Sequence, residues 1–157
     1  MNNIILCGFK SCGKSTLAKK IAEKTGLHYI DTDHLVSKNC RALYLHSVEA
    51  FRDIEKEVVA ALQDFQNAVI ATGGGTILDP DNVAILKKLG TLFYLRVPKE
   101  ELKKRLLVDP LPAILDPADP EGSFEKMYHE RAPLYESVAD HIIDNEDEIW
   151  PLLEKKL

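Results

Sequence analysis

One segment near the N-terminus constrains the fold of this chain more than any other. Residues 8–15 read G-F-K-S-C-G-K-S and fit the P-loop pattern G-x-x-x-x-G-K-S/T without a mismatch. In that pattern the backbone N–H groups of the loop and the N-terminus of the following helix surround a phosphate group. Residues 3–7, apolar from Ile4 onward, read as a short buried strand before the loop, and apolar residues recur at helical spacing over 16–24. The sequence therefore predicts a strand, a phosphate-binding loop and a helix, in that order.

The side chains of this loop predict a site for nucleotide phosphates and Mg²⁺. Lys14 is expected to reach the β- and γ-phosphates, and the Ser15 hydroxyl is expected to bind Mg²⁺. Cys12 either fills space in the loop or has a lowered thiol pKa and a redox role, and the space-filling interpretation is favoured. The predicted nucleotide-binding residues of the loop are Gly8, Lys10, Ser11, Cys12, Gly13, Lys14, Ser15 and Thr16.

Composition limits the class of protein. At 157 residues the chain is long enough for one domain with a sizeable core, and we expect a single domain over 1–157. The net charge of −5 argues against partners such as nucleic acid or anionic membranes, and no apolar run approaches membrane-spanning length. Met1 leads almost directly into the first strand, so no secretory leader is predicted. Cys7, Cys12 and Cys40 lack the spacing of zinc or redox motifs, which favours a reducing, cytoplasmic setting.

Beyond the first helix, strands and helices are predicted to alternate, which is typical of an α/β fold. Gly26 is expected to be the C-cap of the first helix, and Pro133 is expected to break a helix near the C-terminus. The predicted strands cover 27–31, 68–71, 91–95 and 141–144, and the predicted helices cover 47–65, 80–89, 98–107, 124–130 and 148–156.

Two carboxylates follow the second predicted strand. Asp31 and Asp33 lie where open α/β sheets bind ligands, so one can serve a metal and the other a substrate hydroxyl. A structural alternative is that Thr32 or Asp33 caps a helix N-terminus. Many P-loop proteins place a metal-side aspartate after the strand predicted here at 68–71, but this chain has Thr72 there. Asp31 is therefore the candidate for that role.

A helix, a glycine run and a long loop supply further candidates. Arg52 and Glu55 lie one turn apart, either as a surface ion pair or as a substrate-binding arginine held by its carboxylate. The three glycines at 73–75 permit close approach of the backbone to a ligand, or form a flexible turn. Residues 108–123, rich in proline and aspartate, are predicted to form a mobile lid. The basic residues 103–105 are expected to end a helix in solvent.

Taken in order, these motifs resemble those of shikimate kinases. The set consists of the P-loop, D-T-D at 31–33, F-R-x-x-E at 51–55, G-G-G at 73–75 and R-A-P-L-Y at 131–135, and it spans nearly the whole chain. The resemblance implies a three-layer α/β/α P-loop kinase fold with a five-stranded parallel sheet in the order 2-3-1-4-5. It also implies the ATP- and Mg²⁺-dependent phosphorylation of shikimate to shikimate 3-phosphate, a step of aromatic amino-acid biosynthesis, by an expected monomer.

The resemblance further implies a role for each matching residue. Lys14 and Asp33 would be catalytic, Lys14 on the phosphates and Asp33 on the shikimate hydroxyl that is attacked. Ser15 would bind Mg²⁺, and Asp31 would touch the metal shell through water. The other implied contacts are Arg52 and Arg131 to the shikimate carboxylate, Gly74 and Gly75 N–H groups to the substrate, Glu55 to Arg52 and Arg105 along the adenine. Residues 33–62 would form the substrate-binding region.

The chain departs from the family pattern in its lid. Shikimate kinases usually carry a lid arginine that reaches the transferred phosphates, yet residues 106–125 contain no lysine or arginine. Either Asp109 or Leu111 occupies the matching position, and neither can stabilise an anion. An arginine of this kind can contribute orders of magnitude in rate in related phosphoryl transfers.

Two further departures lie near the predicted substrates. The segment between Asp33 and Arg52 is shorter than is usual in the family, and Lys10 and Ser11 replace an apolar residue and a glycine. We hypothesise that Lys10 supplies part of the missing positive charge. The alternative is a lysine that points into solvent.

The same motifs are compatible with other functions. A kinase for another small polyol acid such as gluconate would share the fold, but Arg52, Arg131 and the glycine run disfavour it. The missing lid arginine motivates a catalytically weak protein that binds nucleotide or shikimate. A GTPase switch is less favoured because no Asn-Lys-x-Asp motif occurs.

Overall fold

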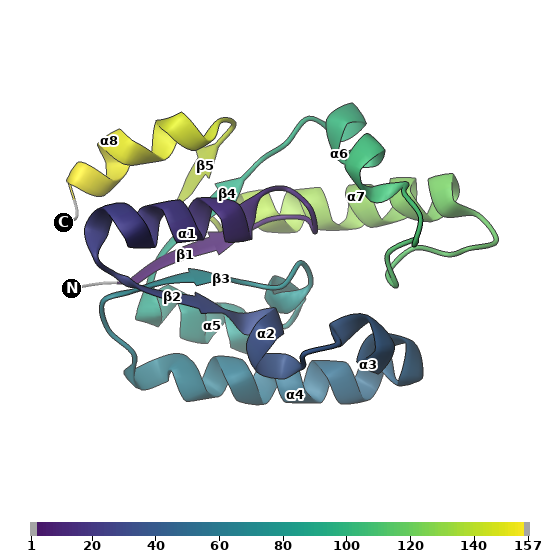
Figure 1. Ribbon diagram of the computed structural model, residues 1–157, viewed down its shortest axis with the longest axis horizontal. Coiled ribbons are helices and arrows are strands. Elements are labelled where there is room, and N and C mark those ends of the chain that lie inside the picture. The colour runs from purple at the N-terminus through teal and green to yellow at the C-terminus, as the bar shows by residue number, and fades with distance from the viewer. Residues whose placement is uncertain (1–2, 156–157) are drawn as a thin grey trace.

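The protein is built on a parallel sheet of five strands, which runs through the centre of Figure 1. The computed structural model describes residues 3–155, with strands β1 (Asn3–Cys7), β2 (His28–Asp31), β3 (Ala68–Ala71), β4 (Gly90–Leu95) and β5 (His141–Ile143). Their order across the sheet is β2-β3-β1-β4-β5, and each neighbouring pair is parallel. The predicted α/β fold and strand order are therefore confirmed.

Helices cover both faces of the sheet, which gives the three predicted layers (Figure 1). One face packs against α1 (Lys14–Thr25) and α8 (Ile149–Glu154). The other packs against α4 (Val48–Ala61), α5 (Pro80–Leu89), α6 (Lys99–Leu106) and α7 (Pro120–Val138). The remaining elements are α2 (Thr32–Val36), α3 (Cys40–His46) and short 3-10 turns at Leu62–Asp64, Thr76–Leu78 and Glu146–Glu148. No helix within residues 3–155 is long and apolar enough to cross a membrane.

Alternate residues of β1 pack against the two helical layers. Ile5 and Cys7 belong to the cluster shared with α4, α5 and α7, whereas Ile4 and Leu6 belong to the cluster shared with α1 and α8. A parallel strand that is covered on both faces is apolar at nearly every position, which explains the apolar run at 4–7. The buried Asn3 at its start donates from Nδ2 to Phe65 O and Leu89 O. Burial raises the pKa of the Cys7 thiol to about 12, so this cysteine is a core side chain rather than a reactive one.

Local signals set several helix ends. Gly26 is the C-cap of α1, with a φ of 77° and its N–H donating to Ala22 O, as predicted. Asp79 caps α5 by accepting a hydrogen bond from Asp81 N at 2.9 Å, and Pro80 is the first helical residue. These caps satisfy backbone groups that have no partner within the helix.

The predicted break at Pro133 is wrong, because α7 runs through it without interruption. A proline inside a helix costs about 3 kcal/mol, since it removes one backbone hydrogen bond and its ring crowds the preceding turn. Phe124 and Tyr135, on either side of Pro133, are fully buried in the core. Burial contributes about 1.5–3 kcal/mol for each large apolar side chain, so the anchored ends offset the cost of the proline.

The loop between α6 and α7, which was predicted to be a mobile lid, packs against the core in part. Leu115 is buried, and Leu115 N donates to Pro112 O at 3.0 Å to close a turn. Because α7 begins at Pro120, the predicted lid at 108–123 includes the first turn of that helix. At the termini, Met1 and the end of the predicted 148–156 helix, Lys156, lie outside the described residues.

Candidate active site

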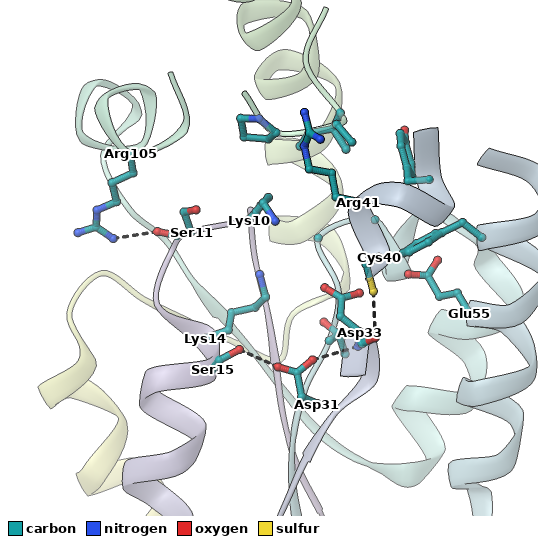
Figure 2. A pocket seen from close by; sticks show the side chains of 18 of the residues that line it. Lys10, Ser11, Lys14, Ser15, Asp31, Asp33, Cys40, Arg41, Glu55 and Arg105 are labelled. Carbon is teal, nitrogen blue, oxygen red and sulfur yellow. Dashed lines mark hydrogen bonds between the residues drawn. The ribbon is translucent and has the colours of Figure 1, made fainter. Parts of the chain in front are cut away.

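A cavity of about 630 Å³ opens at the carboxyl ends of the strands (Figure 2). It lies between the P-loop, the β2–α2 junction, α3, α4, the glycine turn after β3 and the α6–α7 loop. The predicted site residues that line it are Lys10, Ser11, Gly13, Lys14, Ser15, Thr16, Asp31, Asp33, Arg52, Gly74, Gly75, Arg105 and Arg131. Two others, Gly8 and Cys12, are buried beneath the loop and are not among the lining residues.

The P-loop backbone has the turns that its glycines permit. Gly8 and Gly13 have φ angles of 148° and 101°, and a β-carbon on Gly8 would lie 2.9 Å from Cys12 Sγ. Ser11, where the resemblance leads one to expect glycine, also has a positive φ, of 66°. Lys14 Nζ donates to Gly8 O at 2.7 Å and to Phe9 O at 2.8 Å. The loop therefore holds the lysine ammonium in place at the base of the cavity.

Asp31 serves two purposes at the end of β2. Its Oδ1 accepts a hydrogen bond from Asp33 N at 3.0 Å and thereby caps α2, a role that sequence reasoning had considered for Thr32 or Asp33. Its Oδ2 accepts from Ser15 Oγ at 2.8 Å (Figure 2). The same oxygen accepts from Tyr29 OH at 3.1 Å. The first turn of α1 and the end of β2 therefore meet as a hydroxyl–carboxylate pair.

This pair is the best candidate for a metal-binding position. Within residues 3–155, no group of three or more histidine, cysteine or carboxylate side chains could hold a metal ion by itself. Mg²⁺ is usually bound by one or two carboxylates together with water and substrate phosphates. Ser15 and Asp31 fit that pattern, because both present oxygen atoms beside the P-loop.

Asp33 lines the cavity beside the glycine turn. A β-carbon on Gly73 would lie 2.5 Å from Asp33 Oδ1, so the glycine leaves the space that this carboxylate occupies. Burial raises the pKa of the Asp33 carboxyl, and the neighbouring Asp31 carboxylate raises it further, against the charges of Lys14, Lys10 and Arg52. A carboxylate with a raised pKa that faces an open cavity is suited to accepting a proton.

Arg52 is fixed by a buried carboxylate. Its Nη1 donates to Glu55 Oε1 at 2.8 Å, and Thr76 Oγ1 donates to Glu55 Oε2 at 3.0 Å. Glu55 is only 2% exposed, whereas Arg52 lines the cavity. The guanidinium also lies over the Phe51 ring, at 5.4 Å. Of the two sequence interpretations, the pair in the structure is an arginine that faces the cavity and is held from behind.

The glycine turn is supported by a residue that sequence reasoning did not single out. Tyr135, fully buried in α7, donates its hydroxyl hydrogen bond to Gly74 O and packs against Tyr94 and Phe9, with ring centroids at 5.1 and 4.8 Å. A β-carbon on Gly74 would lie 3.7 Å from Arg131 Nη1, which places that arginine beside the turn. The available signal was the position of Tyr135 in the R-A-P-L-Y motif.

Two arginines lie close to the upper part of the cavity. Arg105, at the end of α6, donates from Nη1 to Ser11 O at 3.2 Å and so contacts the P-loop (Figure 2). Arg41, in α3, donates to Leu111 O in the α6–α7 loop. Arg41 has no sequence motif around it, and only the fold reveals it as a cavity residue.

Positive side chains outnumber negative ones in the cavity. Its cationic residues are Lys10, Lys14, Arg41, Arg52, Arg105 and Arg131, and its carboxylates are Asp31, Asp33 and Glu55. An excess of positive charge in a cleft favours anionic ligands. The site can therefore accept a polyphosphate on the P-loop side and a second anion near Arg52 and Arg131.

Comparisons with known proteins agree with this arrangement. Residues 10–152 match the sequence model of the family described as shikimate kinase. A shikimate kinase of Caldicellulosiruptor bescii is 35% identical over 158 residues, covering 98% of this chain and 91% of the relative. One from Francisella philomiragia is 37% identical over 148 residues, covering 90% of this chain and 84% of the relative. The structure of shikimate kinase from Acinetobacter baumannii in complex with shikimate has a TM-score of 0.89 and 28% identity, covering 99% of this chain and 94% of that one.

Proposed function

This chain belongs to the shikimate kinase family, and we infer that it transfers the γ-phosphoryl group of ATP to shikimate, producing shikimate 3-phosphate and ADP. One observation of the site carries this function. A P-loop with Lys14 and Ser15 and a pair of arginines, Arg52 and Arg131, line one cavity with Asp33. That arrangement suits a nucleoside triphosphate that faces a small carboxylated polyol.

For the nucleotide side, we propose that the P-loop amides and Lys14 bind the phosphates and that Arg105 lies along the adenine. The contact between Arg105 and Ser11 O supports this position for the arginine. Ser15 and Asp31 would hold Mg²⁺, Asp31 through water, and the ion would neutralise charge on the β- and γ-phosphate oxygens. The 2.8 Å separation of their oxygen atoms supports a shared role.

For the substrate side, we propose that Arg52 and Arg131 bind the carboxylate of shikimate, because a planar guanidinium matches a carboxylate with two parallel hydrogen bonds. The Gly74 and Gly75 N–H groups would donate to the same substrate. Among the described residues neither of these two N–H groups has a protein acceptor, which supports a role in ligand binding. Asp33 would accept a hydrogen bond from the hydroxyl that reacts.

The reaction follows from that placement. The shikimate hydroxyl oxygen forms a bond to the γ-phosphorus, the bond between that phosphorus and the β,γ-bridging oxygen breaks, and ADP leaves with the electron pair. Asp33 takes the hydroxyl proton, for which its raised pKa is suited. Lys14 stabilises the negative charge on the phosphoryl oxygens. Catalysis then consists mainly of in-line positioning and charge neutralisation.

Lys10 has a proposed electrostatic role in this reaction. It lies at the tip of the P-loop, lines the cavity and lowers the pKa of Asp33 by its charge. A lysine in that place faces the point where the two substrates meet. We therefore retain the proposal that Lys10 supplies part of the positive charge that the α6–α7 loop lacks, although its side chain is exposed.

The setting of the reaction is also a proposal. All three cysteines are free and the reaction consumes ATP, which supports a cytoplasmic location. We also propose that the protein acts as a monomer, because this chain supplies P-loop, metal-side, carboxylate-binding and proton-accepting side chains to one cavity. The α6–α7 loop forms part of the cavity wall with Val108, Pro110 and Pro112, which supports its assignment as a lid.

The decisive experiment measures ADP release with a coupled assay, with shikimate, with gluconate and with neither. We expect release that depends on both ATP and shikimate, and mass spectrometry should identify shikimate 3-phosphate. Release that depends on gluconate instead would assign another polyol acid. Intact ATP binding by calorimetry without shikimate-dependent turnover would replace the kinase with a catalytically weak binding protein, the alternative that the uncharged lid motivates.

A further inference from the structure

We propose that Arg41 is a catalytic residue that brings a guanidinium from α3 to the transferred phosphoryl group. The inference rests on the proposed kinase function and goes beyond it, because none of the roles described above involves Arg41. Its side chain lines the same cavity as Lys14 and Asp33 (Figure 2). Arg41 belongs to α3 and not to the α6–α7 loop, and its side chain reaches the lid side of the cavity through its contact with Leu111 O.

The start of α3 is anchored directly to the element that carries Asp33. Cys40 Sγ lies 3.0 Å from Asp33 O and 3.3 Å from Ser37 O, the two acceptors for its single thiol hydrogen. Asn39 caps the helix by accepting from Ala42 N at 3.1 Å. These contacts hold the start of α3 beside the backbone of Asp33, and the exposed side chain of Arg41 extends from there to Leu111 O. The short connection between α2 and α3 leaves little freedom to place Arg41 elsewhere.

The guanidinium of Arg41 is available for an anion. Its Nε and Nη2 both donate to Leu111 O at 3.4 Å, near the long limit for a hydrogen bond, and this acceptor is neutral. No carboxylate within residues 3–155 forms an ion pair with Arg41. A guanidinium has five N–H donors, so most of them remain for phosphoryl oxygens. Charged phosphoryl oxygens would be far stronger acceptors than the Leu111 carbonyl.

The distribution of positive charge around the cavity explains why a contact between Arg41 and the transferred phosphoryl group would be useful. Residues 106–125, which form the lid side of the cavity, contribute no lysine or arginine. Of the six cations in the cavity, Arg52 and Arg131 are assigned to the substrate carboxylate and Arg105 to the adenine. Lys14 and Lys10 both belong to the P-loop. Arg41 is thus the cation that can approach the transferred group from the lid side of the cavity.

Other roles for Arg41 would change the kinetic constants in a different way. If Arg41 only tethered the lid through Leu111 O, its removal would weaken the binding of substrates or speed their release. If it bound the shikimate carboxylate, its removal would raise the KM for shikimate. A contact made with the transferred phosphoryl group in the transition state lowers kcat and leaves both KM values nearly unchanged.

The test compares Arg41→Met with Lys104→Met, which removes one positive charge from an exposed position on α6 that does not line the cavity. We expect kcat to fall by about 10²-fold in Arg41→Met, as for loss of one transition-state donor, and to stay near the wild-type value in Lys104→Met. Circular dichroism establishes that both variants are folded. A kcat for Arg41→Met equal to that of Lys104→Met, or a change confined to KM, would overturn the proposal.

Two further measurements keep the result specific. Free guanidinium should raise the kcat of Arg41→Ala but not that of Lys104→Ala, because it can occupy the space left by the side chain. The affinity of ADP with aluminium fluoride and shikimate, which mimics the transferred group, should fall in Arg41→Met while ADP alone binds as in the wild type. Absence of both effects contradicts the proposal even if kcat falls. Lack of shikimate-dependent turnover in the wild type would instead refute the proposed function.

Discussion

The guanidinium of Arg52 lies directly against Gly75. A β-carbon on Gly75 would stand 2.5 Å from Arg52 Nη1 and closer still to Nη2, a separation that no real side chain tolerates. A β-carbon on Gly73 would likewise stand 2.5 Å from Asp33 Oδ1. The glycine run was predicted to let a ligand approach the backbone. In the structure the run also makes room for the two side chains proposed to hold shikimate.

The first prediction concerns this contact. Gly75→Ala should displace Arg52 and raise the KM for shikimate by about 10-fold or more, the loss expected for one charge-assisted hydrogen bond, with the KM for ATP little changed. Gly74→Ala is the comparison, since its β-carbon would lie 3.3 Å from the nearest atom and requires only a small adjustment. Steady-state kinetics with each substrate varied separately measures both. Equal effects of the two substitutions would contradict the account.

The architecture follows largely from signals that lie close together in the sequence. The P-loop, the Gly26 cap and the Asp79–Pro80 helix start each depend on residues within one or two turns, and each is found where predicted. The order of motifs predicted the strand order by resemblance. Pro133 shows the limit of such local rules, because Tyr135 is anchored by Phe9 and Tyr94, which lie far away in the chain.

In the candidate site, too, some features were predictable from nearby residues and others depended on the fold. The i,i+3 spacing of Arg52 and Glu55 was visible in the sequence, but whether the pair faced solvent depended on burial of Glu55 against Thr76. Arg41 had no local signal at all. Its contact is with Leu111, 70 residues further along the chain, and only the folded chain brings them together.

The second prediction tests the carboxylate behind Arg52. Glu55→Gln keeps the shape of the side chain but removes the charge that pairs with Arg52, so we expect the free energy of unfolding to fall by about 1.5–3 kcal/mol. The KM for shikimate should rise as well, because Arg52 loses the partner that orients it. Urea unfolding and substrate kinetics measure the two effects. Glu57→Gln, at an exposed position of the same helix, is the control and should change neither.

The third prediction concerns the contribution of Asp33 to the stability of the folded protein, which is separate from its catalytic role. Its pKa is raised in the folded protein by burial and by Asp31. Protonated Asp33 therefore favours the folded state, and this contribution is lost as pH rises from the unfolded pKa, about 3.9, through the raised folded value. At a pH well above the raised pKa, where Asp33 is ionised, Asp33→Asn should raise Tm, and below the unfolded pKa the gain should vanish. An unchanged or lowered Tm at that higher pH would contradict the raised pKa.

The same substitution should nearly abolish turnover. An asparagine side chain at this position cannot accept the hydroxyl proton, so kcat for Asp33→Asn should fall by about 10²–10⁴-fold, the range for loss of a general base. In the wild type, kcat/KM for shikimate should decline as pH falls through the raised pKa of Asp33. Asp53→Asn, at an exposed position of α4, is the matched control and should retain the wild-type profile. A wild-type rate that is independent of pH across this range would exclude Asp33 as the base.

The last prediction concerns Lys10, whose charge opposes the rise in the Asp33 pKa that burial causes. Removal of that charge in Lys10→Met should let the pKa of Asp33 rise further, so the acid limb of the pH profile should move to higher pH. The turnover number should also fall, by about 10-fold if Lys10 neutralises charge on the transferred group, since a tenfold change in rate corresponds to about 1.4 kcal/mol of transition-state stabilisation. Pre-steady-state phosphoryl transfer and a pH series measure both, with Lys104→Met as the control for loss of one surface charge. A rate constant and an acid limb that both match the wild type would mean that Lys10 points into solvent, which would leave Arg41 as the candidate for the charge that the lid lacks.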